Sequence, residues 1–375
     1  MSGGVDSSVV AALLKRDGFD VVGVFMKFWS PAGDIRINTN LKTNLHEFTN
    51  RCCSSEAEGR ARRVAEILAV PFYVVNVEKE FKKEVVDHFL SEYKKGNTPN
   101  PCVVCNKEIK FGILIKKALS LGANYIATGH YAQIGDPNLR KHPNAPNKFS
   151  NNSDGKFGFS DRVLLKGKDA DKDQSYFLWQ LNQKQLSRVL FPVGGYTKPE
   201  VRKLAKKFNL PTAQTPESQE VCFISDTTNN FLKKYLSTRP GLVVDKNGKT
   251  VGEHQGLWFY TIGQRRGLEI QQGPWFAVGK DPKSNILIVS KNEKDLERKE
   301  LIAKDVNWIS GETPKLPFKA QVKVRYKSNS MPSLIRANKG GGVKVIFNKP
   351  QKAITPGQSV VFYRGQELLG GGVIE

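Results

Sequence analysis

A short segment rich in glycine and serine, SGGVDSS at residues 2–8, leads directly into an apolar helical pattern. Adjacent glycines let the backbone turn tightly, and the amides at the start of a helix bind anions. Because the lysine of a Walker A loop is missing, the segment predicts a loop for the pyrophosphate of ATP, with Mg²⁺ offsetting the charge. Adenylation with release of pyrophosphate is the chemistry typical of such a loop. A plain glycine-rich turn is the alternative.

Strand-like and helix-like patterns alternate through the first half of the sequence. Helices are expected at 7–15, from Ser55 with Glu58 completing a capping box, at 80–95, and just after Cys105 at 107–122. Buried strands are expected from Asp20, Phe72 and Asn124. Strands that alternate with helices in this way predict an α/β fold with a parallel sheet covered on both faces.

The second half of the sequence has a different texture. From about Gly241, short β-prone runs such as LWFYTI, WFAVG, KAQVKVRY and SVVFYRG are separated by Gly and Pro. This spacing predicts all-β structure, with a small barrel over about the last eighty residues. Residues 135–160 are polar and rich in Asn, Pro, Gly and Ser, which predicts a long insertion loop.

The charge balance favours a nucleic-acid partner. The 375 residues include 58 Lys and Arg against 36 Asp and Glu, a net charge of +22, and the basic residues are spread along the whole sequence. They predict a large positive surface on folded domains; a generally basic proteome is the alternative. No run approaches the ~18 apolar residues of a membrane helix, and no secretory signal pattern is present. We expect a cytoplasmic protein that does not bind membranes.

The five cysteines, an odd number, do not suggest a disulfide framework. Cys102 and Cys105 form a C-x-x-C pair, which fits half a zinc site with Cys52 and Cys53, a redox pair, or one nucleophile beside a bystander. The adjacent pair is poor zinc spacing. Cys105 precedes a lysine-rich helical pattern that includes Lys107, and this position favours a lowered thiol pKa.

The isolated Cys222 has two interpretations of equal weight. Its apolar neighbours in VCFI are typical of a buried core thiol. The polar residues PESQE directly before it indicate an accessible loop instead.

Eight segments in order across the chain resemble the tRNA-specific 2-thiouridylases. They are SGGVDSS, GVFMKFW, TPNPCVVCNKEIKFG, ATGHYA, KDADKDQSYFL, VCFI, YTIGQRRGL and PGQSVVFYRGQELLGGGVIE. Each is modest alone, but the eight together are specific.

The resemblance implies three domains. Residues 1–218 would form a PP-loop ATP pyrophosphatase domain, of the Rossmann-like adenine nucleotide α-hydrolase class. Residues 219–298 would form a small central α+β domain, and residues 299–375 a β-barrel that binds tRNA. The implied enzyme is a tRNA-uridine 2-sulfurtransferase that converts ATP to AMP and pyrophosphate while thiolating the wobble uridine. The C2 oxygen is adenylated, and a cysteine persulfide then delivers sulfur.

The resemblance also assigns roles to residues. Cys222 would carry the persulfide, and Cys105 would be the second, nucleophilic cysteine. Cys105 would attack that persulfide or help release its sulfur as hydrogen sulfide, and would end disulfide-bonded to Cys222. The uridine must leave the anticodon stack to enter a pocket. Positions for ATP are Ser2, Gly3, Gly4, Val5, Asp6, Ser7, Ser8, Met26 and Gly129. Positions for the target base are Asn100, Pro101 and Cys102, and those for the rest of the tRNA are His130, Lys172, Asp173, Gln174, Arg325, Tyr326 and Gln358. On composition alone, the tRNA positions read as solvated surface residues.

The implied partners are tRNA and a sulfur donor, either a cysteine desulfurase or a sulfur-relay protein, and we expect a monomer. No protein-bound metal is expected, although the thiols leave an iron–sulfur cluster open.

Two features depart from the family pattern. Many members have Asp, a proposed acid/base, where this sequence has Cys102, and a thiol has a pKa roughly four units higher. Members also carry a short strand before the loop, whereas this sequence begins on the loop. We expect that Met1 is an internal methionine and that the natural chain starts upstream. A real truncation, the alternative, would expose the edges of two neighbouring strands.

Two other functions compete. An amidotransferase-type adenylating synthetase would need an ammonia source and gives no reason for the paired cysteines. A nucleic-acid-binding protein with an inactive ATP site belongs to a different class. Measuring whether pyrophosphate release depends on tRNA would distinguish the thiouridylase from these two alternatives.

Overall fold

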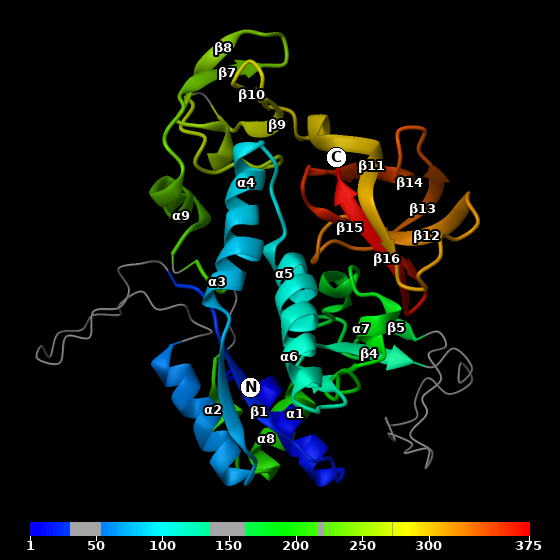
Figure 1. The fold of residues 1–375 in the computed structure, drawn as a ribbon. Coiled ribbons are helices and arrows are strands. Elements are labelled where there is room, and N and C mark those ends of the chain that lie inside the picture. The colour runs from blue at the N-terminus through cyan, green and yellow to red at the C-terminus, as the bar shows by residue number, and fades with distance from the viewer. Residues whose placement is uncertain (31–53, 136–161, 217–220, 225, 272) are drawn as a thin grey trace, which may run out of the picture. The chain divides into compact units, whose positions relative to one another are not determined.

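The computed structural model describes residues 1–30, 54–135, 162–216, 221–224, 226–271 and 273–375 (Figure 1). They form two compact units: unit 1 comprises Met1–Val85 and Val104–Asp226, and unit 2 comprises Val86–Val103 and Thr227–Glu375. Residues 86–103 therefore group with the C-terminal part of the chain, and the three-domain bounds expected from the sequence stay a prediction. Cys52, Cys53 and nearly all of the expected insertion at 135–160 lie outside the described residues.

Unit 1 has the expected α/β character. Its parallel strands are β1 (Gly23–Lys27) with β2 (Phe72–Asn76), and β3 (Ile126–Ala127) with β6 (Val189–Leu190). β4 (Ala132–Gly135) pairs antiparallel with β5 (Val163–Lys166). Among the described residues, the parallel strands thus form two pairs rather than the single expected sheet.

Helices surround these strands. They are α1 (Val5–Arg16), α2 (Ser55–Ile67), α3 (Glu78–Phe81), the π-helical segments η1 (Lys82–Asp87, which runs into unit 2) and η2 (Cys105–Ile113), α6 (Leu114–Ser120), η4 (Ser175–Leu178), α7 (Gln183–Leu186), α8 (Lys198–Lys207) and η5 (Pro211–Gln214).

The core of unit 1 is built around α1. Val9 and Leu13 expose no more than 2% of their surface, and they belong to the same apolar cluster as Val201 and Ala205 of α8. A helix that is apolar on most of its faces is stable only when it is buried. The burial of α1 fixes the glycine loop that precedes it.

Unit 2 contains two β structures. A four-stranded sheet has the order β8 (Thr250–His254), β7 (Gly241–Asp245), β10 (Ile286–Ser290) and β9 (Phe276–Asp281). The predicted C-terminal barrel consists of β11 (Glu297–Trp308), β12 (Phe318–Lys323), β13 (Met331–Ala337), β14 (Val343–Lys352), β15 (Ser359–Arg364) and β16 (Glu367–Ile374). Pairing of β11 with both β14 and β16 closes this barrel.

The remaining elements of unit 2 are helical. They are α4 (His88–Lys94), α5 (Pro101–Val104, whose last residue belongs to unit 1), α9 (Thr228–Tyr235), η6 (Leu257–Phe259) and η7 (Glu293–Leu296).

Three local predictions were wrong. Ser54, not Ser55, caps α2, because its hydroxyl accepts a hydrogen bond from the Ala57 amide at 3.1 Å. The helical run at the C-x-x-C pair begins at Pro101, since proline fits the first position of a helix. The LWFYTI run contains the 3₁₀ turn η6 rather than a strand, an ambiguity typical of short apolar runs.

The approach of α2 to the glycine loop is testable. Gly3 has φ +73°, and a Cβ there would lie 2.2 Å from the Ala57 carbonyl oxygen. Gly18 has φ +86° with nothing within 4 Å of its Cβ position. We expect Gly18→Ala to cost about 1–2 kcal/mol of unfolding free energy for left-handed strain. Gly3→Ala should cost clearly more, because backbone must move. Urea denaturation measures both, and equal losses would contradict the packing described.

Candidate active site

The start of α1 has the geometry of an anion site. Its N-terminal cap is Gly4, and in the described residues no side chain caps the helix. Backbone amides in the first turn of such a helix point at whatever lies beyond it. The hydroxyls of Ser7 and Ser8 donate to the Gly4 carbonyl at 3.1 and 2.9 Å, and the Ser2 amide donates to the Ser7 hydroxyl at 3.1 Å. The side chains of the loop therefore bond within the loop, and none of them caps the N-terminus of α1.

Asp6, in the first turn of α1, is held by two buried side chains. The Lys198 ammonium donates to its two carboxylate oxygens at 2.7 and 2.8 Å. The Tyr131 hydroxyl donates to one of these oxygens at 2.7 Å. Lys198 exposes 7% of its surface and Tyr131 only 2%. The cluster fixes the Asp6 carboxylate and offsets its negative charge beside the end of α1.

The cap of α8 positions this lysine. Lys198 is the first residue of α8, where the helix dipole disfavours a cation. The Thr197 side chain and Glu200 form a reciprocal capping box at this end. The hydrogen bond from the Thr197 amide, followed by that from Lys168, lowers the pKa of Glu200 to about 2. An ionised Glu200 thus secures the turn that carries Lys198.

Other basic and small residues line the loop. The Arg60 Nε of α2 donates to the Gly3 carbonyl at 3.1 Å. A Cβ on Gly129 would lie 2.9 Å from the Asp6 Cβ and 3.1 Å from the Ser7 amide nitrogen. Gly129 comes two residues after β3, and Met26 is the penultimate residue of β1. The structure brings Gly129 against the loop and places Met26 at the carboxyl end of its strand, where ligands of parallel sheets bind.

Cys105 lies inside a helical run, not at its beginning as predicted. Because the run starts at Pro101, Cys102 occupies the first turn, where the helix-end effect acts. Cys105 is buried, with 8% of its surface exposed, and Cys102 is exposed. Lys107, expected to assist the thiol, is 3.2 Å from Glu108 and half exposed.

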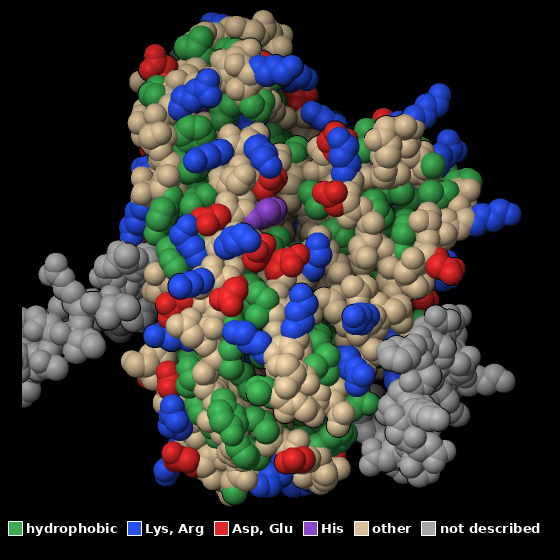
Figure 2. Space-filling model, in the orientation of Figure 1, with side chains coloured by type: hydrophobic (Ala, Val, Ile, Leu, Met, Phe, Trp, Pro, Cys, Tyr) green, Lys and Arg blue, Asp and Glu red, His purple; other side chains and the backbone are tan. Residues whose placement is uncertain are grey.

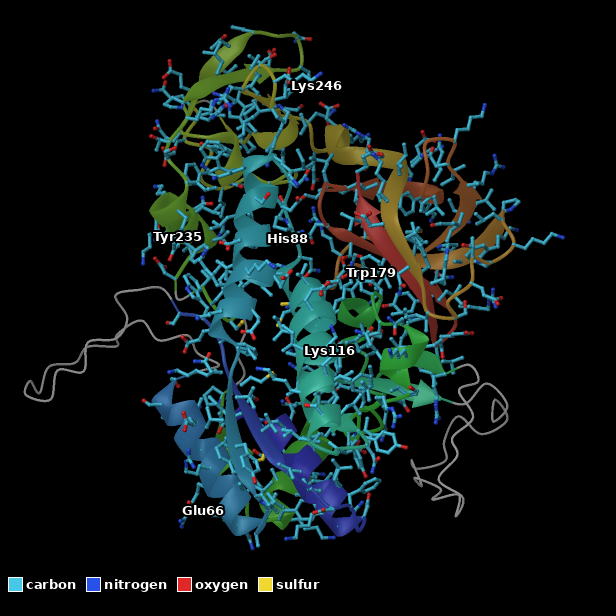
Figure 3. The ribbon with its side chains drawn as sticks, in the orientation of Figure 1. Glu66, His88, Lys116, Trp179, Tyr235 and Lys246 are labelled. Carbon is cyan, nitrogen blue, oxygen red and sulfur yellow. The ribbon has the colours of Figure 1, made fainter. Side chains whose placement is uncertain are left out.

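The helix that carries Cys105 is wide and firmly packed. η2 is π-helical, a form that often occurs at functional sites. Asn106 is 3% exposed; its amide donates to the Phe177 carbonyl at 3.1 Å, and its own oxygen has no partner among the described residues. Trp179, just after η4, is fully buried, whereas Lys116 projects from α6 to solvent (Figure 3).

The segment of Cys222 packs against α3, the same helix that the Cys105 segment contacts. Cys222 is half-buried, and its neighbour Phe223 is 2% exposed. The Phe223 ring packs against Phe81 at 5.8 Å between centroids, and Phe81 packs against Phe28 at 4.8 Å. η2, which begins at Cys105, also contacts α3, the helix of Phe81. Both cysteine segments therefore pack around α3.

Two predicted tRNA contacts in unit 1 are buried. His130 exposes 8% and makes a 2.8 Å hydrogen bond with Thr128. Its ring packs against those of Phe111 and Phe191, with centroids 5.7 and 5.8 Å away. Burial, and secondly Lys110, holds the pKa of His130 well below its usual value.

Asp173 exposes 5% and accepts hydrogen bonds from the amides of Gly167 and Ser175. The side chain of Gln174 accepts from the Tyr131 amide at 3.0 Å, and Lys172 is half-buried. These residues hold the loop between β5 and η4, and their contact with tRNA stays a prediction.

The other predicted tRNA residues belong to unit 2. Arg325 donates to the Thr355 hydroxyl at 2.9 Å and to the Ala353 carbonyl, and Tyr326 is half-buried. Gln358 donates through Nε2 to the carbonyls of Thr98 and Pro99. The predicted base positions Asn100, Pro101 and Cys102 lie in the same unit.

The positively charged side chains on the visible face of the protein do not form one patch. On the face shown in Figure 2, Lys and Arg side chains are scattered, with Asp and Glu among them. Among the described residues, no group of three His, Cys, Asp or Glu is placed to hold a metal ion. In the same part of the chain, no helix is long and apolar enough to cross a membrane.

The sequence analysis missed Lys198 and Tyr131. The signal for Lys198 is a lysine at the first position of a well-capped helix, an unfavourable place for a cation unless an acid lies nearby. Tyr131 lies within the ATGHYA segment, but nothing local indicates that its hydroxyl reaches Asp6, 125 residues earlier.

Comparison with known proteins matches the whole chain. Residues 1–226 match the tRNA methyl transferase HUP domain, residues 229–291 the tRNA methyl transferase PRC-barrel domain, and residues 298–374 the aminomethyltransferase beta-barrel domain. Three proteins named tRNA-specific 2-thiouridylase MnmA or MnmA 2 are similar over 100% of the chain. They are from Carboxydothermus hydrogenoformans (45% identity, 96% of the relative covered), Clostridioides difficile (43%, 96%) and Geobacillus kaustophilus (42%, 93%).

The Asp6 cluster predicts a difference between two lysines. Lys198→Met leaves a partly buried carboxylate without its cation and should cost about 2–3 kcal/mol of unfolding free energy. Lys168→Met removes an ion pair with Glu200 whose two side chains are 49% and 42% exposed, and should cost under about 1 kcal/mol. Adding Asp6→Asn to Lys198→Met should recover part of the loss. Urea denaturation tests this, and equal costs for both lysines would refute a special role for Lys198.

Proposed function

The chain belongs to the family of tRNA-specific 2-thiouridylases, and we propose that it thiolates C2 of the wobble uridine in tRNA in two steps, base activation and sulfur transfer. One observation carries this proposal. The unit that presents the uncapped helix end of the glycine loop also holds the segments of Cys105 and Cys222, both packed around α3.

The first step takes place at the glycine loop. A pyrimidine carbonyl is a poor electrophile, and ATP supplies the adenylyl group that makes its oxygen a leaving group. The residues fit the phosphates of ATP, because the amides at the start of α1 favour negative charge and the Lys198 cation offsets the Asp6 carboxylate in the same turn. Gly129 leaves the space that a larger side chain beside Asp6 would fill.

Mg²⁺ is part of this proposal. It usually binds one or two carboxylates together with substrate phosphates and water. Asp6 is the carboxylate in the first turn of α1, and it already accepts hydrogen bonds from Lys198 and Tyr131. We therefore propose that Asp6 fixes the positions of Lys198 and Tyr131, and we expect Mg²⁺ to bind together with the phosphates of ATP.

The second step uses the two cysteines. The terminal sulfur of a persulfide on Cys222 attacks C2, and the activated oxygen leaves with AMP. The Cys105 thiolate then attacks the Sγ of Cys222, which breaks the S–S bond, leaves sulfur on the base and forms a Cys105–Cys222 disulfide. An external dithiol reductant restores the two thiols. The half-buried Cys222 is reachable by a sulfur donor, whereas the buried Cys105 is shielded from side reactions.

The substrate and partner assignments complete the proposal. Asn100, Pro101 and Cys102 would line the base, and the remaining predicted positions would contact the tRNA or position the residues that do. The exposed Cys102 replaces the family's usual Asp, so a different group would move protons. We propose a cysteine desulfurase or a sulfur-relay protein as donor, a monomeric enzyme, and a cytoplasmic reaction.

The cysteine assignment predicts a specific loss of product. Cys105→Ser and Cys222→Ser should each abolish 2-thiouridine in a deletion strain complemented with the variant, measured by mass spectrometry of tRNA nucleosides. Both variants should still release pyrophosphate from ATP in the presence of tRNA, because base activation needs no thiol. Cys52→Ser, the matched control, should leave both readouts unchanged.

Two outcomes would overturn these assignments. Wild-type 2-thiouridine in either active-site variant would exclude that cysteine from sulfur transfer. Pyrophosphate release by the wild-type enzyme that is independent of tRNA would favour a different adenylating enzyme.

A further inference from the structure

A short segment of unit 2, residues 96–99, leads directly into the three positions predicted to line the target base. It is not a loose loop, because the turn between β14 and β15 binds it. The Thr98 amide donates to the Pro356 carbonyl at 2.9 Å. The Gln358 side chain donates to the carbonyls of Thr98 and Pro99 at 2.7 and 3.3 Å. The backbone just before Asn100 is thus paired with the barrel.

The contact at the centre of this turn leaves no room for a side chain. Gly357 has φ +87° and lies directly against the segment. A Cβ there would be 2.8 Å from the Asn97 Cβ and 3.0 Å from the Thr98 amide nitrogen. The turn and the segment therefore meet backbone to backbone.

Other parts of unit 2 hold the segment as well. The Lys280 ammonium of β9 donates to the Gly96 carbonyl at 2.9 Å, and burial lowers the pKa of Lys280 to about 8. The hydroxyls of Thr98 and Thr261 are 3.3 Å apart. The Asn97 amide donates to Glu92 of α4 at 2.7 Å. Four elements thus fix a segment of four residues.

The turn itself is tied into the barrel. The Gly357 amide donates to the Ile374 carbonyl and the Ile374 amide to the Gln358 carbonyl, both at 2.8 Å. Arg325 donates to the Thr355 hydroxyl at the start of the turn at 2.9 Å. The Gln358 backbone amide donates to the Thr355 carbonyl at 3.2 Å. Arg325 and Gln358, both predicted to contact tRNA, are therefore linked through Thr355 to Thr98 and Pro99, directly before the predicted base positions.

We propose that the 356–358 turn of the barrel is a positioning element for the target-base residues Asn100–Cys102, with Gln358 acting through the 96–99 segment. A side-chain amide has two N–H groups, and those of Gln358 point to the carbonyls of Thr98 and Pro99. Its main role is then to set the base positions rather than to bind RNA. This inference rests on the proposed function, because it takes Asn100–Cys102 as the base site.

A matched pair of glycines tests the proposal. Gly341 has φ +88° but nothing within 4 Å of its Cβ position. Gly341→Ala and Gly357→Ala therefore carry the same left-handed strain, and only Gly357→Ala pushes on the 96–99 segment. With the full-length enzyme, single-turnover rates of tRNA-dependent pyrophosphate release and the Kd for unmodified tRNA are measured at saturating ATP.

We expect Gly357→Ala to lower the rate at saturating tRNA at least about tenfold, because small displacements of reacting groups are costly. Its Kd for tRNA should stay within about twofold of wild type, and Gly341→Ala should match wild type in both. Gln358→Ala should resemble Gly357→Ala. In both positioning variants, hydrogen exchange of the Thr98 amide should accelerate, which shows the released segment directly.

Opposite results would overturn the inference. A weaker Kd with an unchanged rate at saturating tRNA in Gln358→Ala would make Gln358 an RNA contact only. Equal behaviour of the two glycine variants in rate and exchange would remove the positioning role. A wild-type enzyme that makes no 2-thiouridine would instead refute the proposed function, so the two failures are distinguishable.

Discussion

The bond between Lys198 and Asp6 is the interaction on which the candidate site depends. It joins the start of α1 to the start of α8 across 192 residues of sequence, and the Tyr131 hydroxyl adds a third segment. A buried ammonium is costly without a partner, so the contact with Asp6 stabilises the packing of Lys198 and the start of α8 against α1. The same bond offsets the charge of the Asp6 carboxylate in the first turn of α1, a helix whose N-terminus has no side-chain cap among the described residues. The same contact therefore serves the stability of unit 1 and the geometry of the proposed phosphate site.

A different kind of contact holds the segment of Cys222, the proposed persulfide carrier. Aromatic packing of Phe223 on Phe81, and of Phe81 on Phe28, fixes the Cys222 segment beside the carboxyl end of β1. The buried Phe223 limits the movement of the adjacent Cys222, whose side chain is only half-buried. Cys105 begins the π-helical segment η2, which contacts α3. The side chain of Asn106 in η2 donates a hydrogen bond to the Phe177 carbonyl. Lys107, expected from the sequence to assist the Cys105 thiol, forms an ion pair with Glu108.

In unit 2, hydrogen bonds join the barrel turn to the segment just before Asn100–Cys102, the positions predicted to line the target base. The 96–99 segment precedes Asn100–Cys102, and its carbonyls and amide are satisfied by side chains and backbone from β9, α4 and the barrel turn. Buried backbone polar groups must find partners, and here they find them in elements far along the chain. A residue such as Gln358 can then look like a surface contact in sequence while its amide faces inward.

The sequence by itself determined the classes of element, the closed C-terminal barrel, the nucleotide loop and the family. These are properties of contiguous residues, since glycine spacing, apolar period and short motifs are local. It misplaced the start of the helix at Cys105, because a proline at a first helical position looks like a loop residue. Only the tertiary structure decided that His130 and Asp173 are buried, that Lys198 and Tyr131 hold Asp6, and that Gln358 faces Thr98, 260 residues away. The physical reason is that burial and long-range pairing are set by whichever segment folds over a residue, and no local pattern encodes that neighbour.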